Sequence, residues 1–223
     1  MFKTRLMSKS QATRQKISAV AIRSFRDRGY DQTTLRLIAS EAEVSVGNAY
    51  YYFPTKNHLV QELYETVQTE HRELAEPRLA GIAGLAPRLE VALATGLEAL
   101  EPYHSAAPGF LAAAISPTSA VNPLSESSTT ARDSAISLFR TVVDGSSAAL
   151  PPRLKAALPE LLWFAYLALA LYWVYDRSPG QRKSTMLLKR SCALFGTVLP
   201  LLRLPFFHGP LNEALDLVDE ARA

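Results

Sequence analysis

The chain has 223 residues, of which 48% are hydrophobic and 20% are charged, and it contains a single cysteine, Cys192. This composition supports a folded core and excludes a largely disordered chain. One cysteine excludes an internal disulfide and a zinc site built from cysteines, and it fits a reducing, cytoplasmic location.

The net charge of +3 is unevenly distributed along the sequence. Residues 1–58 carry ten Lys or Arg and four Asp or Glu, a net charge of +6, whereas residues 59–223 carry a net charge of −3. A basic N-terminal segment joined to a mildly acidic remainder predicts that the first part meets a polyanion while the second has another task. Charge alone leaves open the alternative that the basic surface is only solvated.

Apolar residues recur at intervals of three and four, which predicts helices along the whole chain. The first four are expected over 11–28, 34–42, 45–52 and 55–77. The first has an apolar stripe formed by Ile17, Val20, Ala21 and Phe25 and ends before Gly29. Later helices are expected over 86–101, 108–115, 130–149, 152–177, 182–203 and 211–221, with a Ser-, Thr- and Pro-rich loop at 116–130.

The segment "TTLRLIASEAEVSVGNAYYYFPTKNHL", residues 33–59, contains the strongest functional pattern. Two short helices joined by a tight turn fit a helix-turn-helix, whose second helix enters the major groove of DNA. Small residues allow close approach to the groove, Asn48 can pair with adenine or phosphate, and tyrosine hydroxyls can bond phosphate oxygens. We expect Tyr50 and Tyr51 to face outward, and Tyr52 and Phe53 to turn inward.

These residues resemble the tetracycline-repressor (TetR) family of bacterial regulators over about residues 11–64. The resemblance rests on Phe25, Gly29, Tyr30, "TTLRLIASEAEVS", Tyr50, Tyr52, Phe53, Lys56 and Leu59. It implies an all-α homodimer that binds a palindromic double-stranded DNA operator. The DNA candidates are Thr34, Arg36, Ser45, Val46, Gly47, Asn48, Tyr50, Tyr51 and Lys56. One departure is Glu43, which stands in the turn where the family usually has Gly.

The expected organisation is a three-helix, helix-turn-helix head in residues 1–55 and a larger helical body in residues 56–223, with helix 56–76 connecting them. The body is expected to bind a ligand and to dimerise through helices 152–177 and 182–203, although both could simply be core helices of a monomer. The interface candidates are Tyr172, Met186, Ala193, Gly196 and Pro200.

A pocket in the body would suit an apolar or aromatic small molecule, because few polar residues accompany its apolar candidates. The candidates for its lining are Leu93, Leu97, Tyr103, His104, Phe110, Phe139, Arg140, Trp163 and Tyr166. Repression relieved by such an effector is the expected function. No cofactor or metal is implied.

The sequence also bears on three other functions. An enzyme is disfavoured, because the four histidines are scattered and the sequence contains no zinc-protease motif, phosphate-binding loop or serine elbow. A membrane protein is disfavoured, because the apolar run 161–175 would span only about 22 Å against a bilayer core of about 30 Å. A ligand-blind regulator whose body only dimerises remains compatible with the sequence.

Overall fold

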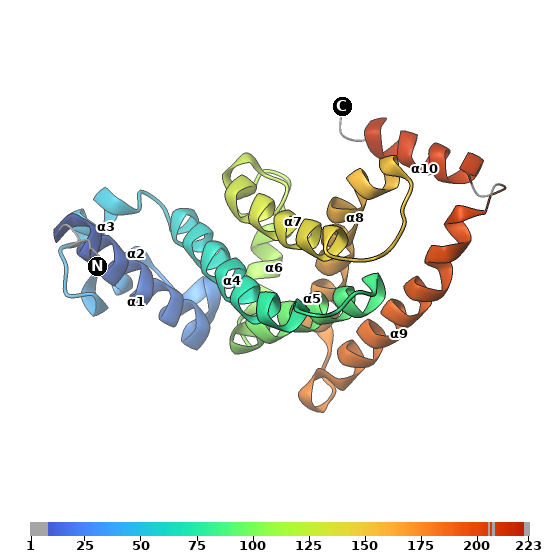
Figure 1. The fold of residues 1–223 in the computed structure, drawn as a ribbon. Coiled ribbons are helices and arrows are strands. Elements are labelled where there is room, and N and C mark those ends of the chain that lie inside the picture. Colours follow the sequence, from blue (N-terminus) through green and yellow to red (C-terminus); the bar gives the residue numbers. More distant parts are fainter. Residues whose placement is uncertain (1–8, 205, 207, 221–223) are drawn as a thin grey trace, which may run out of the picture. The chain divides into compact units, whose positions relative to one another are not determined.

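The computed structural model describes residues 9–204, 206 and 208–220, and every regular element in these residues is a helix (Figure 1). The all-α prediction is therefore confirmed. The chain forms two compact units. Unit 1 comprises residues 1–67 and 101–132, and unit 2 comprises residues 68–100 and 133–223. The predicted functional boundary at residues 55 and 56 is a different division, and it stays a prediction.

Unit 1 begins with α1 (Lys9–Gln32), α2 (Leu35–Glu41) and α3 (Val46–Tyr52). The predicted stripe of α1 is confirmed, because Ile17, Val20, Ala21 and Phe25 are all buried. Gly29 interrupts the helix with φ 81°, a left-handed value that glycine adopts without steric cost.

The first half of α4 (Lys56–Leu79) and residues 101–132 complete unit 1. The latter contain η1 (Glu101–Tyr103), α6 (Ala107–Ile115) and η2 (Glu126–Ser128). Phe110 of α6 packs edge-on against Phe25 and Tyr30, at ring-centroid distances of 5.3 and 5.7 Å. Tyr64 donates a hydrogen bond to the carbonyl of Val121 at 3.0 Å. Burial raises the pKa of Tyr64 to about 12, so its hydroxyl stays a donor.

Unit 2 contains the second half of α4 together with five further helices. These are α5 (Leu85–Leu100), α7 (Thr129–Asp144, from residue 133), α8 (Pro152–Tyr175), α9 (Arg182–Val198) and α10 (His208–Glu220). Two short 3₁₀ helices, η3 (Pro179–Gln181) and η4 (Leu199–Arg203), flank α9. The core lies where α5 packs on α8 and α9, and it includes Leu89, Leu93, Leu162, Trp163 and Leu188.

Several predicted helix bounds were wrong, and three of them have a clear physical reason. The connecting helix continues past Pro77 to Leu79, because buried Ala75 and Leu79 anchor its last turns and a proline there removes only one backbone bond. The helix predicted over 130–149 ends at Asp144. The Val142 carbonyl, which the Ser146 amide would reach in a longer helix, instead accepts a hydrogen bond from Arg88 at 2.9 Å. The helix predicted over 182–203 tightens into η4 after Val198, where Pro200 follows.

Candidate nucleic-acid interface

The two short helices of unit 1 begin at side-chain caps. The Thr34 hydroxyl accepts a hydrogen bond from the Leu37 amide at 3.2 Å, and the Ser45 hydroxyl accepts one from the Asn48 amide at 3.1 Å. Each bond satisfies an amide that lacks a partner inside the first helical turn, which is why these residue types favour a helix start. Both residues were predicted as DNA contacts, which stays a prediction, and the structure shows them as helix caps.

The turn between α2 and α3 contains a strained residue. Glu43 has φ 51°, which confirms that a non-glycine residue holds a left-handed conformation there. Its carboxylate lies 3.0 Å from the Lys16 ammonium group, but both side chains are exposed and such a pair contributes little. The turn is held mainly by backbone bonds, such as that from the Val44 amide to the Ala39 carbonyl at 3.0 Å.

Helix α3 has one buried face and one exposed face. Ala49 and Phe53 are four residues apart and almost fully buried, so they fix the helix to its unit. Of the other large side chains, Val46 is 41% exposed, Tyr50 46% and Tyr51 78%. A Cβ on Gly47 would meet no atom within 4 Å, so this position is open. The outward placement of Tyr50 and Tyr51 and the inward placement of Phe53 agree with expectation, whereas Tyr52, also expected to face inward, is only half-buried.

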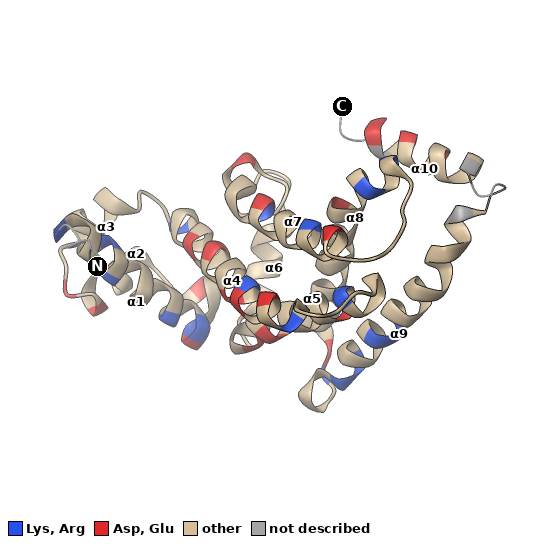
Figure 2. Ribbon diagram, viewed as in Figure 1, with Lys and Arg blue, Asp and Glu red and all other residues tan. Residues whose placement is uncertain are grey.

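Unit 1 carries charges of both signs, and several of its cations form ion pairs (Figure 2). Arg14 pairs with Glu62, and Arg28 pairs with Glu41 at 2.6 Å. Arg36, in contrast, is exposed and has no ion pair or side-chain hydrogen bond among the described residues. It is therefore a cation that remains available to a polyanion. Residues 1–8, which carry part of the predicted basic charge, lie outside the described residues.

Lys56 is engaged inside the unit. Its ammonium group donates to the Tyr30 carbonyl at 2.9 Å and lies 3.8 Å from the centre of the Tyr30 ring. Burial lowers the pKa of Lys56. This position was predicted to contact phosphate, and that contact stays a prediction.

The predicted ligand residues are divided between the units. Leu93, Leu97, Phe139, Trp163 and Tyr166 are buried in unit 2, where Arg140 is exposed. Tyr103, His104 and Phe110 belong to unit 1. A lining role for these residues stays a prediction.

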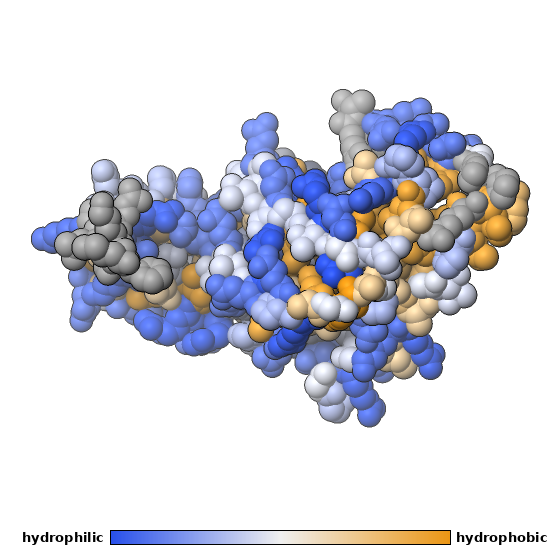
Figure 3. All heavy atoms as spheres, in the orientation of Figure 1, coloured by the Kyte–Doolittle hydropathy of each residue, from blue (hydrophilic) through white to orange (hydrophobic). Residues whose placement is uncertain are grey.

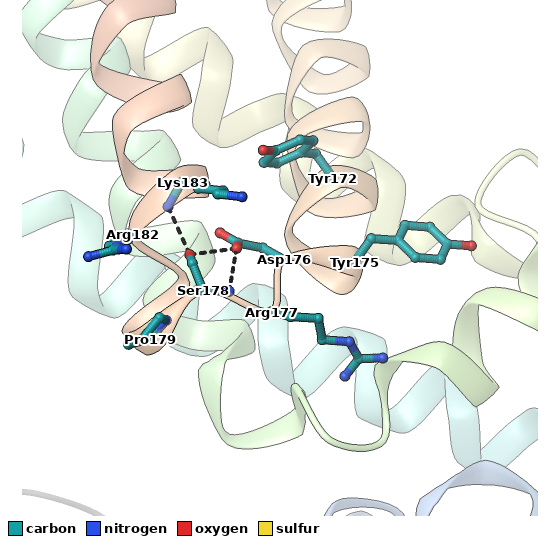
Figure 4. Close-up of a pocket in the computed structure, with 8 residues that line it drawn as sticks. All are labelled: Tyr172, Tyr175, Asp176, Arg177, Ser178, Pro179, Arg182 and Lys183. Atoms are coloured by element: carbon teal, nitrogen blue, oxygen red, sulfur yellow. Dashed lines mark hydrogen bonds between the residues drawn. The ribbon is translucent and has the colours of Figure 1, made fainter.

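A pocket of about 390 Å³ lies at the turn between α8 and α9 (Figure 4). It is lined by Tyr172, Tyr175, Asp176, Arg177, Ser178, Pro179, Arg182 and Lys183. Arg177 and Arg182 point in different directions, so the cations do not converge on one point. Burial would raise the pKa of Asp176, but hydrogen bonds from the amides and hydroxyls of Ser178 and Ser184 outweigh it and hold that pKa below its usual range. Asp176 therefore stays charged and fastens the beginning of α9.

Sequence reasoning missed two buried polar residues of unit 2, His71 and Arg88. His71 had a detectable signal, because it continues the every-fourth-residue stripe Leu59, Leu63 and Val67 along α4. Arg88 is a single cation among the apolar residues of α5, which gave a weaker signal.

Two short capped helices, a tight turn and an exposed face on the second helix define a helix-turn-helix DNA-binding protein. Residues 17–63 match the family described as "Bacterial regulatory proteins, tetR family", and residues 88–220 match the "Tetracyclin repressor-like, C-terminal domain". The chain belongs to the TetR family of transcriptional regulators.

An uncharacterised helix-turn-helix regulator of Mycobacterium bovis is 43% identical over 56 residues, which are 25% of this chain and 26% of that protein. The match thus spans about a quarter of that relative's length. A TetR regulator from Nitrosomonas europaea has the same fold, with a TM-score of 0.61 at 17% identity over 82% of this chain and 97% of its own. The regulator FadR from Bacillus subtilis, solved with stearoyl-CoA, has a TM-score of 0.57 at 14% identity over 83% and 96% of the two chains.

Two segments, Pro152–Tyr175 and Pro179–Leu202, are long and apolar enough to cross a membrane by length and composition alone. Half of the apolar window in the first is buried inside the protein, as in a core helix, whereas most of the second is exposed.

Proposed function

We propose that the protein is a cytoplasmic homodimeric repressor that binds a palindromic operator through α3 and leaves it when an apolar or aromatic molecule binds unit 2. The observation that carries this proposal is the exposed face of Val46, Gly47, Tyr50 and Tyr51, set against the buried face that holds α3 in place. Aromatic rings and hydroxyls left in water on a fixed helix are suited to a groove and its phosphates.

Homodimerisation is supported by apolar side chains that unit 2 leaves exposed. On α8 they are spaced along one stripe, with Phe164 43%, Leu171 44% and Tyr175 64% exposed. On α9, Leu194 is 64% exposed, and hydrophobic residues are visible over its later turns (Figure 3). Burying this surface against a second copy removes apolar area from water, which favours association. Tyr172, Met186, Ala193 and Pro200 are exposed and available for such an interface.

Gly196 has a different environment from the other predicted interface residues. A Cβ added there would lie 3.0 Å from the Cβ of Ala86 on α5. Its lack of a side chain therefore supports the packing of α9 within one protomer. A place for Gly196 in the dimer interface stays a prediction.

Release by an effector is supported by the path of α4, which starts in unit 1 at Lys56 and ends in unit 2 at Leu79. An effector that binds one arrangement of this helix better than another would shift operator affinity. The shift equals the difference between its binding free energies for the two arrangements, typically about 1–3 kcal/mol. The protein FadR, which shares the fold, was solved with stearoyl-CoA, an apolar-chain ligand. A regulator that dimerises without any effector is the alternative.

The test is a gel-shift titration against duplexes selected from a random pool by the protein itself. Tyr50→Phe, which removes one hydroxyl, should weaken binding roughly tenfold if that hydroxyl bonds a charged phosphate. Thr141→Val is the control, since it removes an exposed hydroxyl from α7 in unit 2. Binding should also fall steeply with salt. Equal affinities of both variants and the unaltered protein would remove Tyr50 from the interface, and failure to select any duplex would refute the repressor function.

A further inference from the structure

The buried face of α4 carries an unusual polar group. His71 is fully buried, and its Nε2 atom lies 2.8 Å from the carbonyl oxygen of Ala92 on α5. Its other ring nitrogen, Nδ1, is the one buried side-chain nitrogen or oxygen without a hydrogen-bond partner in the part of the chain that the structure describes. Buried polar atoms are nearly always paired, so an unpaired one calls for an explanation.

The hydrogen bond to Ala92 determines what Nδ1 can do. A carbonyl oxygen only accepts, so Nε2 must carry the proton and donate it. Burial lowers the pKa of His71, which keeps the ring neutral near pH 7. In this tautomer Nδ1 has no proton and is a hydrogen-bond acceptor. Its missing partner is therefore a donor.

The His71 ring packs against an aromatic side chain and a glycine within unit 2. The Tyr166 ring lies 5.5 Å from the His71 ring, and the Phe139 ring lies 6.0 Å from that of Tyr166. Gly96 lies against both, because a Cβ there would come within 3.0 Å of His71 Cε1 and 2.6 Å of the Tyr166 ring. The neighbouring cation, Arg72, is engaged by Glu76 and by the Ser134 carbonyl.

Polar groups of this protein near His71 are already in use. The Thr95 hydroxyl donates to the carbonyls of Val91 and Ala92. The Tyr166 hydroxyl donates to the Gly96 carbonyl at 3.4 Å, a long bond near the limit for such contacts. The Tyr166 side chain is thus held by one long hydrogen bond, and moving its ring aside would give a ligand access to the His71 side chain.

We propose that the effector is an aromatic molecule bearing a hydroxyl group, and that His71 Nδ1 accepts the hydrogen bond from this hydroxyl. The inference rests on the proposed function, because it specifies the effector that unit 2 would bind. The ring of the effector would pack on Phe139 and Tyr166, and its hydroxyl would supply the missing donor. A carboxylate has no proton to donate, and an ammonium group would lose its hydration without gaining a counter-ion.

The test compares 2-naphthol with naphthalene by calorimetric titration of the full-length protein. The two probes share an aromatic shape and differ in the hydroxyl, so 2-naphthol should bind at least tenfold more tightly. His71→Phe retains a ring of similar size without the acceptor, and it should reduce this preference to less than threefold. His58→Phe, a change at an exposed histidine of unit 1, is the control and should leave the preference intact.

A second measurement requires no variant that might fail to fold. The ring nitrogens of the four histidines can be followed by ¹⁵N NMR in the unaltered protein. One buried histidine should show an unprotonated Nδ1 and a protonated Nε2, and 2-naphthol should shift the Nδ1 signal toward that of a hydrogen-bonded nitrogen. Equal binding of the two probes, binding of neither, or a protonated Nδ1 would each overturn the proposal.

Operator release is measured separately by gel shift with and without 2-naphthol. If 2-naphthol binds through His71 but the operator is not released, the proposed effector response is wrong and the proposed binding site at His71 stands. If the protein binds the operator but neither 2-naphthol nor naphthalene, the proposed effector site at His71 is wrong and the DNA-binding function stands.

Discussion

Arg88 provides a sharp test of how unit 2 is held together. Its side chain is buried and donates four hydrogen bonds of 2.9–3.0 Å to the carbonyls of Leu79, Ile82, Thr141 and Val142. These carbonyls lie at or just beyond the end of α4 and in the last turn of α7, where helices leave carbonyls unpaired and carry partial negative charge. One guanidinium therefore joins the ends of two helices to the beginning of α5.

The effect of Arg88→Met can be worked out from these contacts. Thr141 and Leu79 each keep a bond, from the Gly145 amide at 3.1 Å and the Ile82 amide at 3.3 Å. The carbonyls of Ile82 and Val142 have no other donor among the described residues. Each carbonyl left without a donor costs about 1–3 kcal/mol. The variant also no longer buries a cation, which offsets part of this cost. The free energy of unfolding should therefore fall by about 3 kcal/mol.

Urea unfolding monitored by tryptophan fluorescence measures this loss, because both tryptophans, Trp163 and Trp173, lie on α8 in unit 2. Arg78→Met is the matched control. Arg78 is about half exposed and pairs with Glu98, so its loss should cost less than about 1 kcal/mol. If Arg88→Met unfolds within 1 kcal/mol of the unaltered protein, or no earlier than the control, the reasoning about the orphaned carbonyls is wrong.

Three other predictions concern the turn, the buried histidine and the dimer. Glu43→Gly should relieve the left-handed strain and stabilise α2 and α3 by about 1 kcal/mol, seen as slower amide hydrogen exchange there; faster exchange would contradict it. Because the folded state lowers the pKa of His71, the unfolded chain binds more protons below about pH 6.5, so unit 2 should lose stability from pH 7 to pH 5. Urea midpoints should show this loss in the unaltered protein and a smaller one in His71→Phe; an equal loss would place the effect elsewhere. Leu194→Glu should give a folded monomer by sedimentation, whereas Leu217→Glu, equally exposed on α10, should remain dimeric; a dimer in both variants would move the interface away from α9.

The helix-turn-helix part of unit 1 was predictable because its determinants are local. Thr34 and Ser45 cap the helices they precede, Gly29 takes the left-handed conformation, and the stripe from Ile17 to Phe25 is buried. Caps, turns and helical periodicity depend on residues within four or five positions of each other. The sequence alone therefore determined the helices, their order and the outward face of α3.

Contacts between distant residues were decided by the tertiary structure. Phe110 packs on Phe25 across 85 residues, which no local pattern encodes, and this places α6 in unit 1 with the DNA-binding helices. Gly196 reads as a small interface residue in sequence, yet it lies against Ala86. Burial and hydrogen bonding of single polar groups depend in the same way on what other helices bring close. The stripe of α4 could indicate that His71 faces inward, but only the packing of α5 and α8 around it pairs one ring nitrogen and leaves the other without a partner.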